Sequence, residues 1–206
     1  MQILHSTELI IKSILETRIL KAYCENKTEL HIYADKIKKL SNYNKTHIDY
    51  NLVLYMMHCL SKQQLILEKT GFSFYTFCLK DIIVIDDTYF FCINSNLIMP
   101  IKKNMLLFFK PITKKREEKE EGEEKEEKEE KDIDFNSPEL AAMISIPFKL
   151  SYKTIYYSLG ALAIYYLGNP SHYEYTKLYW FIKRCIGTQD KTQDKTQDIE
   201  RQLLFI

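Results

Sequence analysis

The spacing of apolar residues along the chain predicts a fold that is mainly helical. In several segments, apolar residues recur three and four positions apart or fill the segment completely, which is typical of amphipathic and buried helices. These segments are 8–23, 28–40, 49–69, 155–168 and 175–185. Gly71 follows the third of them, and a glycine just past the last periodic residue favours the end of a helix. We therefore expect helices over most of the chain, including its first 50 residues.

One β-hairpin is predicted beside these helices. Two runs rich in β-branched and aromatic residues, 82–85 and 90–93, flank a short acidic turn. Residues 97–112 are mixed and apolar, with Pro100 and Pro111 as breakers. The predicted fold class is therefore α+β, mainly α with a small β-hairpin.

The segment 155–168 is almost free of polar side chains, which raises the question of a membrane span. It is shorter than the roughly 20 apolar residues that cross a bilayer, so a buried core helix is the better interpretation. Small residues within it would let other elements approach its backbone closely: Ser158, Gly160, Ala161 and Ala163. The N-terminus carries Glu8 and Lys12 within its apolar stretch and has no small-residue cleavage site, which argues against a signal peptide.

Charge is distributed unevenly although the formal net charge is only +1. Residues 114–132 are almost entirely Lys, Arg and Glu, and we expect a disordered, solvated insertion there. The TQDK repeat at 188–198 predicts a lengthened loop. The remaining basic residues are spread along the chain and form no basic stripe, so nucleic-acid binding is not expected.

Cysteine and histidine positions indicate neither a disulfide framework nor a metal centre. The five cysteines are widely spaced and include no C-x-x-C pair, which favours a reducing, intracellular compartment. The five histidines have no metal-ligand spacing with each other or with a cysteine. An inert, buried thiol is the better interpretation of Cys78, and His58 fits a hydrogen-bonded core or rim position.

The order of these elements and a few short motifs resemble the C-terminal lobe of a protein kinase. S-P-E at 137–139 stands where kinases carry A-P-E, and Y-S-L-G at 157–160 stands at the start of their buried hydrophobic helix. The phrases FSFY, DIIVIDD, INSNLI and TKLYWF make the chain especially similar to small kinase-like proteins of large double-stranded DNA viruses. The resemblance implies structural roles, including an ion pair between the glutamate and the arginine, for Pro138, Glu139, Ser158, Gly160 and Arg201.

The same alignment places a degenerate catalytic loop after the long helix. Leu67 precedes Phe74 by seven residues, as the leucine of the kinase L-H pair precedes the histidine of H-R-D. The loop positions then fall on Phe74, Tyr75, Thr76, Cys78 and Asp81, and the D-F-G metal position falls on Asn94. Thr76 cannot act as the catalytic base, and Cys78 replaces the loop lysine. Asp81 and Asn94 exchange the usual positions of the metal-binding asparagine and aspartate, so Asp81 is a weak candidate metal ligand.

The resemblance also implies a division of the chain. Residues 51–206 would form the kinase-like lobe, and residues 1–50 a helical extension in place of a standard N-terminal lobe. No G-x-G-x-x-G sequence and no V-A-I-K lysine occurs, so the adenine cleft between two lobes is not expected.

These losses favour a catalytically inactive pseudokinase that acts as a protein-binding or regulatory scaffold. Its expected partners are host or viral proteins, including kinases or kinase substrates, with no cofactor or metal, no nucleic acid and no membrane span. The expected location is intracellular, in the cytoplasm of an infected cell or in the virion. The aromatic-rich stretch 165–180 is the candidate contact face. One alternative is an atypical phosphotransferase that binds ATP with Mg²⁺ through Asp81, and another is a structural viral component.

Overall fold

The computed structural model describes residues 1–43, 45, 48–110, 133–168 and 170–187. The described helices are α1 (Glu8–Thr17), α2 (Tyr50–Lys69), α3 (Pro138–Ala141), α4 (Ile155–Leu167) and α5 (Lys177–Gly187). The described strands are β1 (Gln2–His5), β2 (Ala22–Asn26), β3 (Glu29–Ile32), β4 (Ile37–Lys39), β5 (Phe72–Phe74), β6 (Ile82–Ile85), β7 (Tyr89–Cys92), β8 (Ile98–Pro100), β9 (Met105–Phe108) and β10 (Phe148–Ser151). The predicted insertion 114–132 and the repeat loop 188–198 lie outside the described residues.

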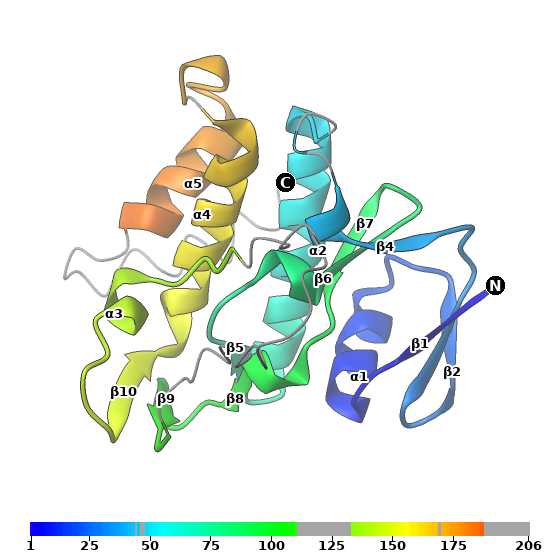
Figure 1. Ribbon diagram of the computed structural model, residues 1–206, viewed down its shortest axis with the longest axis horizontal. Coiled ribbons are helices and arrows are strands. Elements are labelled where there is room, and N and C mark those ends of the chain that lie inside the picture. Colours follow the sequence, from blue (N-terminus) through cyan, green and yellow to red (C-terminus); the bar gives the residue numbers. More distant parts are fainter. Residues whose placement is uncertain (44, 46–47, 111–132, 169, 188–206) are drawn as a thin grey trace, which may run out of the picture.

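The fold is α+β with several small antiparallel sheets (Figure 1). The sheets have the orders β1-β3-β2, β4-β6-β7, β5-β8 and β9-β10. The prediction of a mainly α chain, with one hairpin and a largely absent N-terminal lobe, is therefore wrong. The architecture is mixed, and the error is concentrated in the first 50 residues, which contribute four of the strands.

Strands replace most of the helix predicted for the N-terminal region. Helix α1 ends at Thr17, and Arg18 takes a left-handed conformation with φ 55° that closes it. The predicted helix at 28–40 is instead β3, β4 and a short helical turn. The apolar positions in this segment fit the 3.6-residue period of a helix and also the two-residue period of a strand. In the structure, Leu30 and Ile32 are two residues apart and are buried on one face of a strand. The side-chain oxygen of Asn26 accepts a hydrogen bond from the backbone N–H of Thr28, and this local turn favours a hairpin over a continuing helix.

The long central helix and the hairpin agree with the sequence. Asp49 caps α2, because its carboxylate accepts a hydrogen bond from the backbone N–H of Leu52 at 2.8 Å. Strands β6 and β7 pair in antiparallel register, from Ile82 opposite Cys92 to Ile85 opposite Tyr89. Asp86 and Asp87 both have positive φ, 49° and 54°, at the centre of a tight turn in which the Thr88 N–H donates to the Ile85 carbonyl at 3.0 Å. The Asp86 carboxylate also accepts the backbone N–H groups of Asp35 and Lys36, both at 2.9 Å, and so holds β4 beside β6.

Helix α4 is largely buried, which confirms the interpretation of the apolar stretch as core. Its neighbours α2 and α5 both pack on it, and Figure 1 shows α4 and α5 side by side. Gly160 makes the contact with α5 possible, because a Cβ there would lie 2.8 Å from Cys185 Cβ and 3.0 Å from Ile186 Cγ1. Among the described residues, no helix combines the length and apolar character that a membrane crossing requires.

One hydrophobic core extends across residue 50. In Figure 1, α1 lies between α2 and the sheet that contains β1 and β2. Buried polar contacts join the two regions: the Gln63 side-chain amide donates to Ser13 Oγ at 3.0 Å and to the Cys92 carbonyl at 2.9 Å. Its oxygen accepts the backbone N–H of Cys92 at 3.0 Å. The division into residues 1–50 and 51–206 stays a prediction, and the residues on either side of it share this core.

Candidate functional site

The loop that follows β5 carries buried apolar rings at the positions where the kinase resemblance predicts a degenerate catalytic loop. Phe74 and Phe77 are fully buried, and their ring centroids are 5.3 Å apart. Thr76 lies between them in the chain and is only 5 % exposed. Its hydroxyl approaches the carbonyl of Phe77 at 3.5 Å, which is a long, local contact. Thr76, at the position of the expected catalytic base, is therefore buried, and its hydroxyl accepts no proton at neutral pH.

Asp81 and Asn94 are brought together by the hairpin. The backbone N–H of Ile93 donates to the carbonyl of Asp81 at 2.9 Å, which extends the β6–β7 ladder by one step. At that end of the ladder, the side-chain amide of Asn94 donates to Asp81 Oδ1 at 2.9 Å. Asn94 Oδ1 accepts the backbone N–H of Asn96 at 3.0 Å, so the amide is oriented with its nitrogen toward Asp81. The nitrogen of Asn94, and not the oxygen that a metal ion would need, therefore faces the Asp81 carboxylate.

A third polar residue, Asp134, lies beside Cys78 of the same loop, and sequence reasoning did not single it out. The segment 133–135 pairs with the loop, because Leu79 N–H donates to the Ile133 carbonyl and Phe135 N–H donates to the Phe77 carbonyl. The pKa of the Cys78 thiol is raised to about 12, chiefly by burial and to a lesser extent by a hydrogen bond with Asp134. Asp134 stands in an apolar–polar–apolar triplet, Ile133-Asp134-Phe135, and that alternation is the only local sign of strand-like pairing.

Tyr75, in the same loop, is largely buried. Burial raises the pKa of its hydroxyl, and the nearby charges of Asp134 and Asp81 raise it further. Its ring meets the ring of Phe108 edge-on, with centroids 5.4 Å apart. At this site, Cys78 and Tyr75 are thus both held in their protonated forms at neutral pH, and neither is available as a nucleophile or base.

The other residues implied by the resemblance have structural positions. The Ser137 hydroxyl accepts the backbone N–H of Leu140 at 3.1 Å and caps α3, with Pro138 at the first helical position. Glu139 is exposed, and Arg201 lies outside the described residues, so their ion pair stays a prediction. Ser158 is fully buried in α4, and Gly160 allows the close approach of α5.

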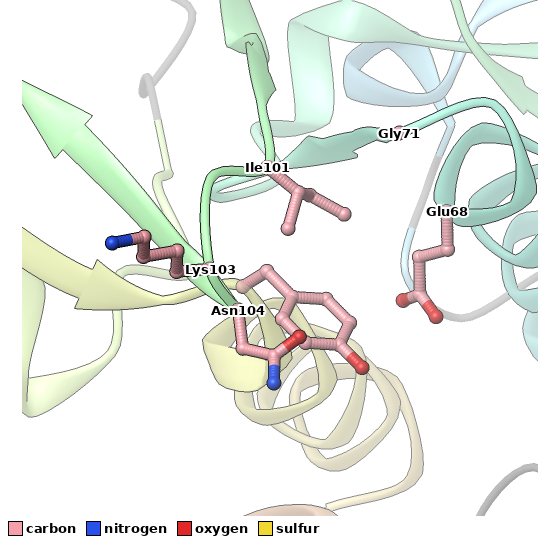
Figure 2. Close-up of a pocket in the computed structure, with 6 residues that line it drawn as sticks. Glu68, Gly71, Ile101, Lys103 and Asn104 are labelled. Atoms are coloured by element: carbon pink, nitrogen blue, oxygen red, sulfur yellow. The ribbon is translucent and has the colours of Figure 1, made fainter.

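A pocket of about 320 Å³ lies away from this loop, at the end of α2 (Figure 2). Glu68 lines one side and the turn between β8 and β9 lines the other, through Lys103 and Asn104. Figure 2 shows the amino group of Lys103 pointing away from Glu68. The Glu68 carboxylate accepts hydrogen bonds from Gln64 at 2.7 Å and from the Tyr156 hydroxyl at 3.0 Å. These bonds join α2 to α4, so Glu68 has a structural role that needs no ligand.

The aromatic stretch 165–180 is partly core and partly surface. Tyr166 and Tyr173 are buried, whereas Tyr175 is 80 % exposed and Trp180 is 51 % exposed. The Trp180 ring meets the ring of Tyr179 edge-on, with centroids 5.2 Å apart, so its orientation is supported by its neighbour. The large exposed aromatic side chains of this stretch are thus Tyr175, two residues before α5, and Trp180 on α5.

Comparison with known proteins assigns the chain to no family. No protein-family model matches the sequence, and no curated protein matches it either. The resemblance to kinase-like proteins therefore stays a prediction that rests on the motifs quoted above.

Proposed function

We propose that this chain is a catalytically inactive, kinase-like protein that acts by binding other proteins. The observation that carries the proposal is the hydrogen bond from Asn94 to Asp81, at the two positions where a kinase would hold its metal ions. Each side chain satisfies the other, and the Asn94 oxygen is bound to the backbone of Asn96. The amide nitrogen, which is not a metal ligand, faces the carboxylate, and this orientation supports a hydrogen-bonded pair over a magnesium site.

The loop chemistry supports the same proposal. Phosphoryl transfer depends on positioned charges around the phosphates and on a group that accepts the proton of the substrate hydroxyl. Thr76, at the expected base position, is buried and bonded locally, and Cys78 replaces the loop lysine. Because burial raises the pKa of Cys78 to about 12, this position carries no charge at neutral pH.

A nucleotide titration tests the catalytic part of the proposal. The thermal midpoint of the purified chain is measured with millimolar ATP, with and without Mg²⁺ or Mn²⁺, and we expect no shift. A ligand at 100 times its Kd would stabilise the protein by about 2.7 kcal/mol, which is a shift of several degrees. A metal-dependent shift that disappears in Asp81→Ala would instead support the phosphotransferase alternative and overturn the proposal.

A binding experiment with matched variants tests the scaffold part. Exposed Trp and Tyr residues dominate the binding energy of many protein interfaces, so Trp180→Ala and Tyr175→Ala are the informative changes. Tyr55, 53 % exposed on α2, gives the control Tyr55→Ala. Tagged variants are compared by quantifying the proteins recovered from extracts of infected host cells. We expect Trp180→Ala to lose a partner that both the wild type and Tyr55→Ala retain. Equal recovery by all variants would remove the α5 face from the proposal.

A further inference from the structure

The outward face of the N-terminal sheet gathers two carboxylates and an imidazole. Strand β3 contributes Glu29 and His31, two residues apart on one face of the strand, and β2 contributes Glu25. One ligand atom from each of these three side chains lies within 4.8 Å of the others. Among the residues that the structure describes, this is the set of histidine, cysteine and carboxylate groups whose spacing fits a metal ion.

His31 is buried although it lies on this outward face. It is only 5 % exposed, and the ring of Tyr23 stacks on it with centroids 4.9 Å apart and planes 12° apart. Its Nε2 lies 2.6 Å from Glu25 Oε2, but the contact lacks the angular geometry of a hydrogen bond. Neither ring nitrogen has a hydrogen-bond partner among the described residues. A buried imidazole whose nitrogens make no hydrogen bond is costly, and a cation on Nε2 would satisfy that nitrogen.

A β-bulge brings Glu25 into the cluster. The pairing of β2 with β3 shifts between Cys24 and Asn26, so Glu25 is the extra residue opposite the ladder. Bulges commonly redirect a side chain, and here the carboxylate reaches His31 on the neighbouring strand. On the other side of β3, His5 Nδ1 lies 3.7 Å from Glu29 Oε1, which adds a second imidazole at the edge of the cluster.

We propose that Glu25, Glu29 and His31 form a Zn²⁺ site that ties β2 to β3. One imidazole nitrogen and two carboxylate oxygens match the ligand types of zinc, with one coordination position left toward solvent. Imidazole favours zinc over magnesium or calcium, which prefer oxygen ligands alone. Tetrahedral ligands lie farther apart than 2.6 Å, and the Glu25 side chain, 63 % exposed, is free to rotate outward and make room.

The site is independent of the kinase-like loop and of the proposed scaffold function. A bound zinc ion would hold β2 and β3 together in the sheet next to α1. It would stabilise the N-terminal region, because metal binding to the folded state adds to the free energy of folding. The pairing of Glu25 with His31 would then be the arrangement in the absence of zinc. The purely structural alternative is that these groups form only surface ion pairs, which contribute little to stability.

The test is a zinc titration of the full chain by competition with a fluorescent zinc indicator, in a Cys24→Ser background. That background removes the exposed thiol of Cys24, which would bind zinc on its own. We expect binding of one Zn²⁺ and a rise in the thermal midpoint, with no comparable effect of Mg²⁺ or Ca²⁺. Glu25→Gln and Glu29→Gln should each weaken zinc affinity at least about tenfold, since even the loss of an outer-shell partner costs that much.

Matched controls separate the site from general surface binding. Glu16→Gln and His172→Gln change exposed residues of the same types outside the cluster and should leave zinc affinity unchanged. His31→Gln should abolish binding, and circular dichroism shows whether that variant still folds. Because Glu25 is exposed, Glu25→Gln keeps the test decisive if His31→Gln unfolds. Equal zinc affinity in Glu25→Gln and Glu16→Gln, or no saturable binding at all, would overturn the proposal.

Discussion

The amide of Asn94 donates a hydrogen bond to the carboxylate of Asp81 over 2.9 Å, although the two residues are 13 positions apart. The β6–β7 hairpin lies between them, and its ladder brings its two ends side by side. The pair is therefore a consequence of the hairpin register. A kinase would use a carboxylate and an amide oxygen at such positions to bind metal ions. In this protein, the amide nitrogen instead donates a hydrogen bond to the carboxylate.

Replacing Asn94 by aspartate should destabilise the protein. Asn94→Asp removes the donor and sets two carboxylates against each other at hydrogen-bond distance, which should lower the free energy of unfolding by about 1–3 kcal/mol. Urea denaturation at pH 7 measures the loss. The control is Asn96→Asp, which adds the same charge two residues away at an exposed position and should change stability little. Equal losses in the two variants would mean that the Asp81–Asn94 bond has no special role.

A methyl group at Gly160 should separate α4 from α5. Its Cβ would lie 2.8 Å from Cys185 Cβ, closer than packed atoms allow, so Gly160→Ala should cost about 1–3 kcal/mol in overpacking despite the higher helix propensity of alanine. Thermal or urea unfolding measures the change. Gly187→Ala is the matched control, because a Cβ on that helical glycine would meet nothing within 4 Å. A neutral Gly160→Ala would show that the two helices are not held at this spacing.

Long, strongly patterned elements were predictable from the sequence, and α2, the hairpin and α4 are the examples. Each combines an unbroken pattern with local end signals, such as Asp49 at the start of α2 and the acidic turn at Asp86 and Asp87. The N-terminal strands were not predictable by the same means. Residues 28–40 are short apolar and polar alternations that fit a helix or a strand, and pairing with β1, β2 and β6 decided between them.

The candidate site, like the fold, was predictable only in part, because some of its contacts depend on residues far apart in the sequence. The kinase resemblance implied that Asp81 and Asn94 occupy the two metal-binding positions, but it did not indicate that the amide nitrogen would face the carboxylate. Asp134 lies beside Cys78 because 133–135 pairs with the loop after β5, across the charged segment, and no local pattern predicts such a contact. The cluster at Glu25 depends on a bulge, which is likewise invisible until the strand register is known.

The five cysteines should divide sharply in reactivity toward a thiol reagent. Cys24 is exposed, while the other four are buried. Burial raises the pKa of Cys59 to about 11 and that of Cys78 to about 12, and it also raises the pKa of Cys92 and Cys185. Since the thiolate is the reactive form, a chromogenic thiol titration at pH 8 should find one reactive group in the folded chain and five after denaturation.

The variant Cys24→Ser identifies the reactive group. It should remove the fast phase of the titration and leave four thiols that react only after unfolding. Rapid modification of a second cysteine in the folded protein would contradict the packing around that residue. Cys78 is the most informative of the four, because its reaction would show that the loop opens to solvent.

The stability of the protein should fall as the pH decreases from 7 toward 5.5, in part because of His58. Burial lowers the pKa of His58 below its usual value of 6.5, and the neighbouring charge of Lys62 lowers it further. The neutral ring is therefore favoured in the folded state. Above pH 6.5 the ring is neutral in both states and costs nothing; below it, the unfolded chain binds the proton more readily, so stability is lost until the pH passes the folded-state pKa. His58→Gln should flatten this part of the pH profile of urea unfolding, and His172→Gln, at an exposed position, should leave it as in the wild type. An unchanged slope in His58→Gln would assign the acid sensitivity to other groups.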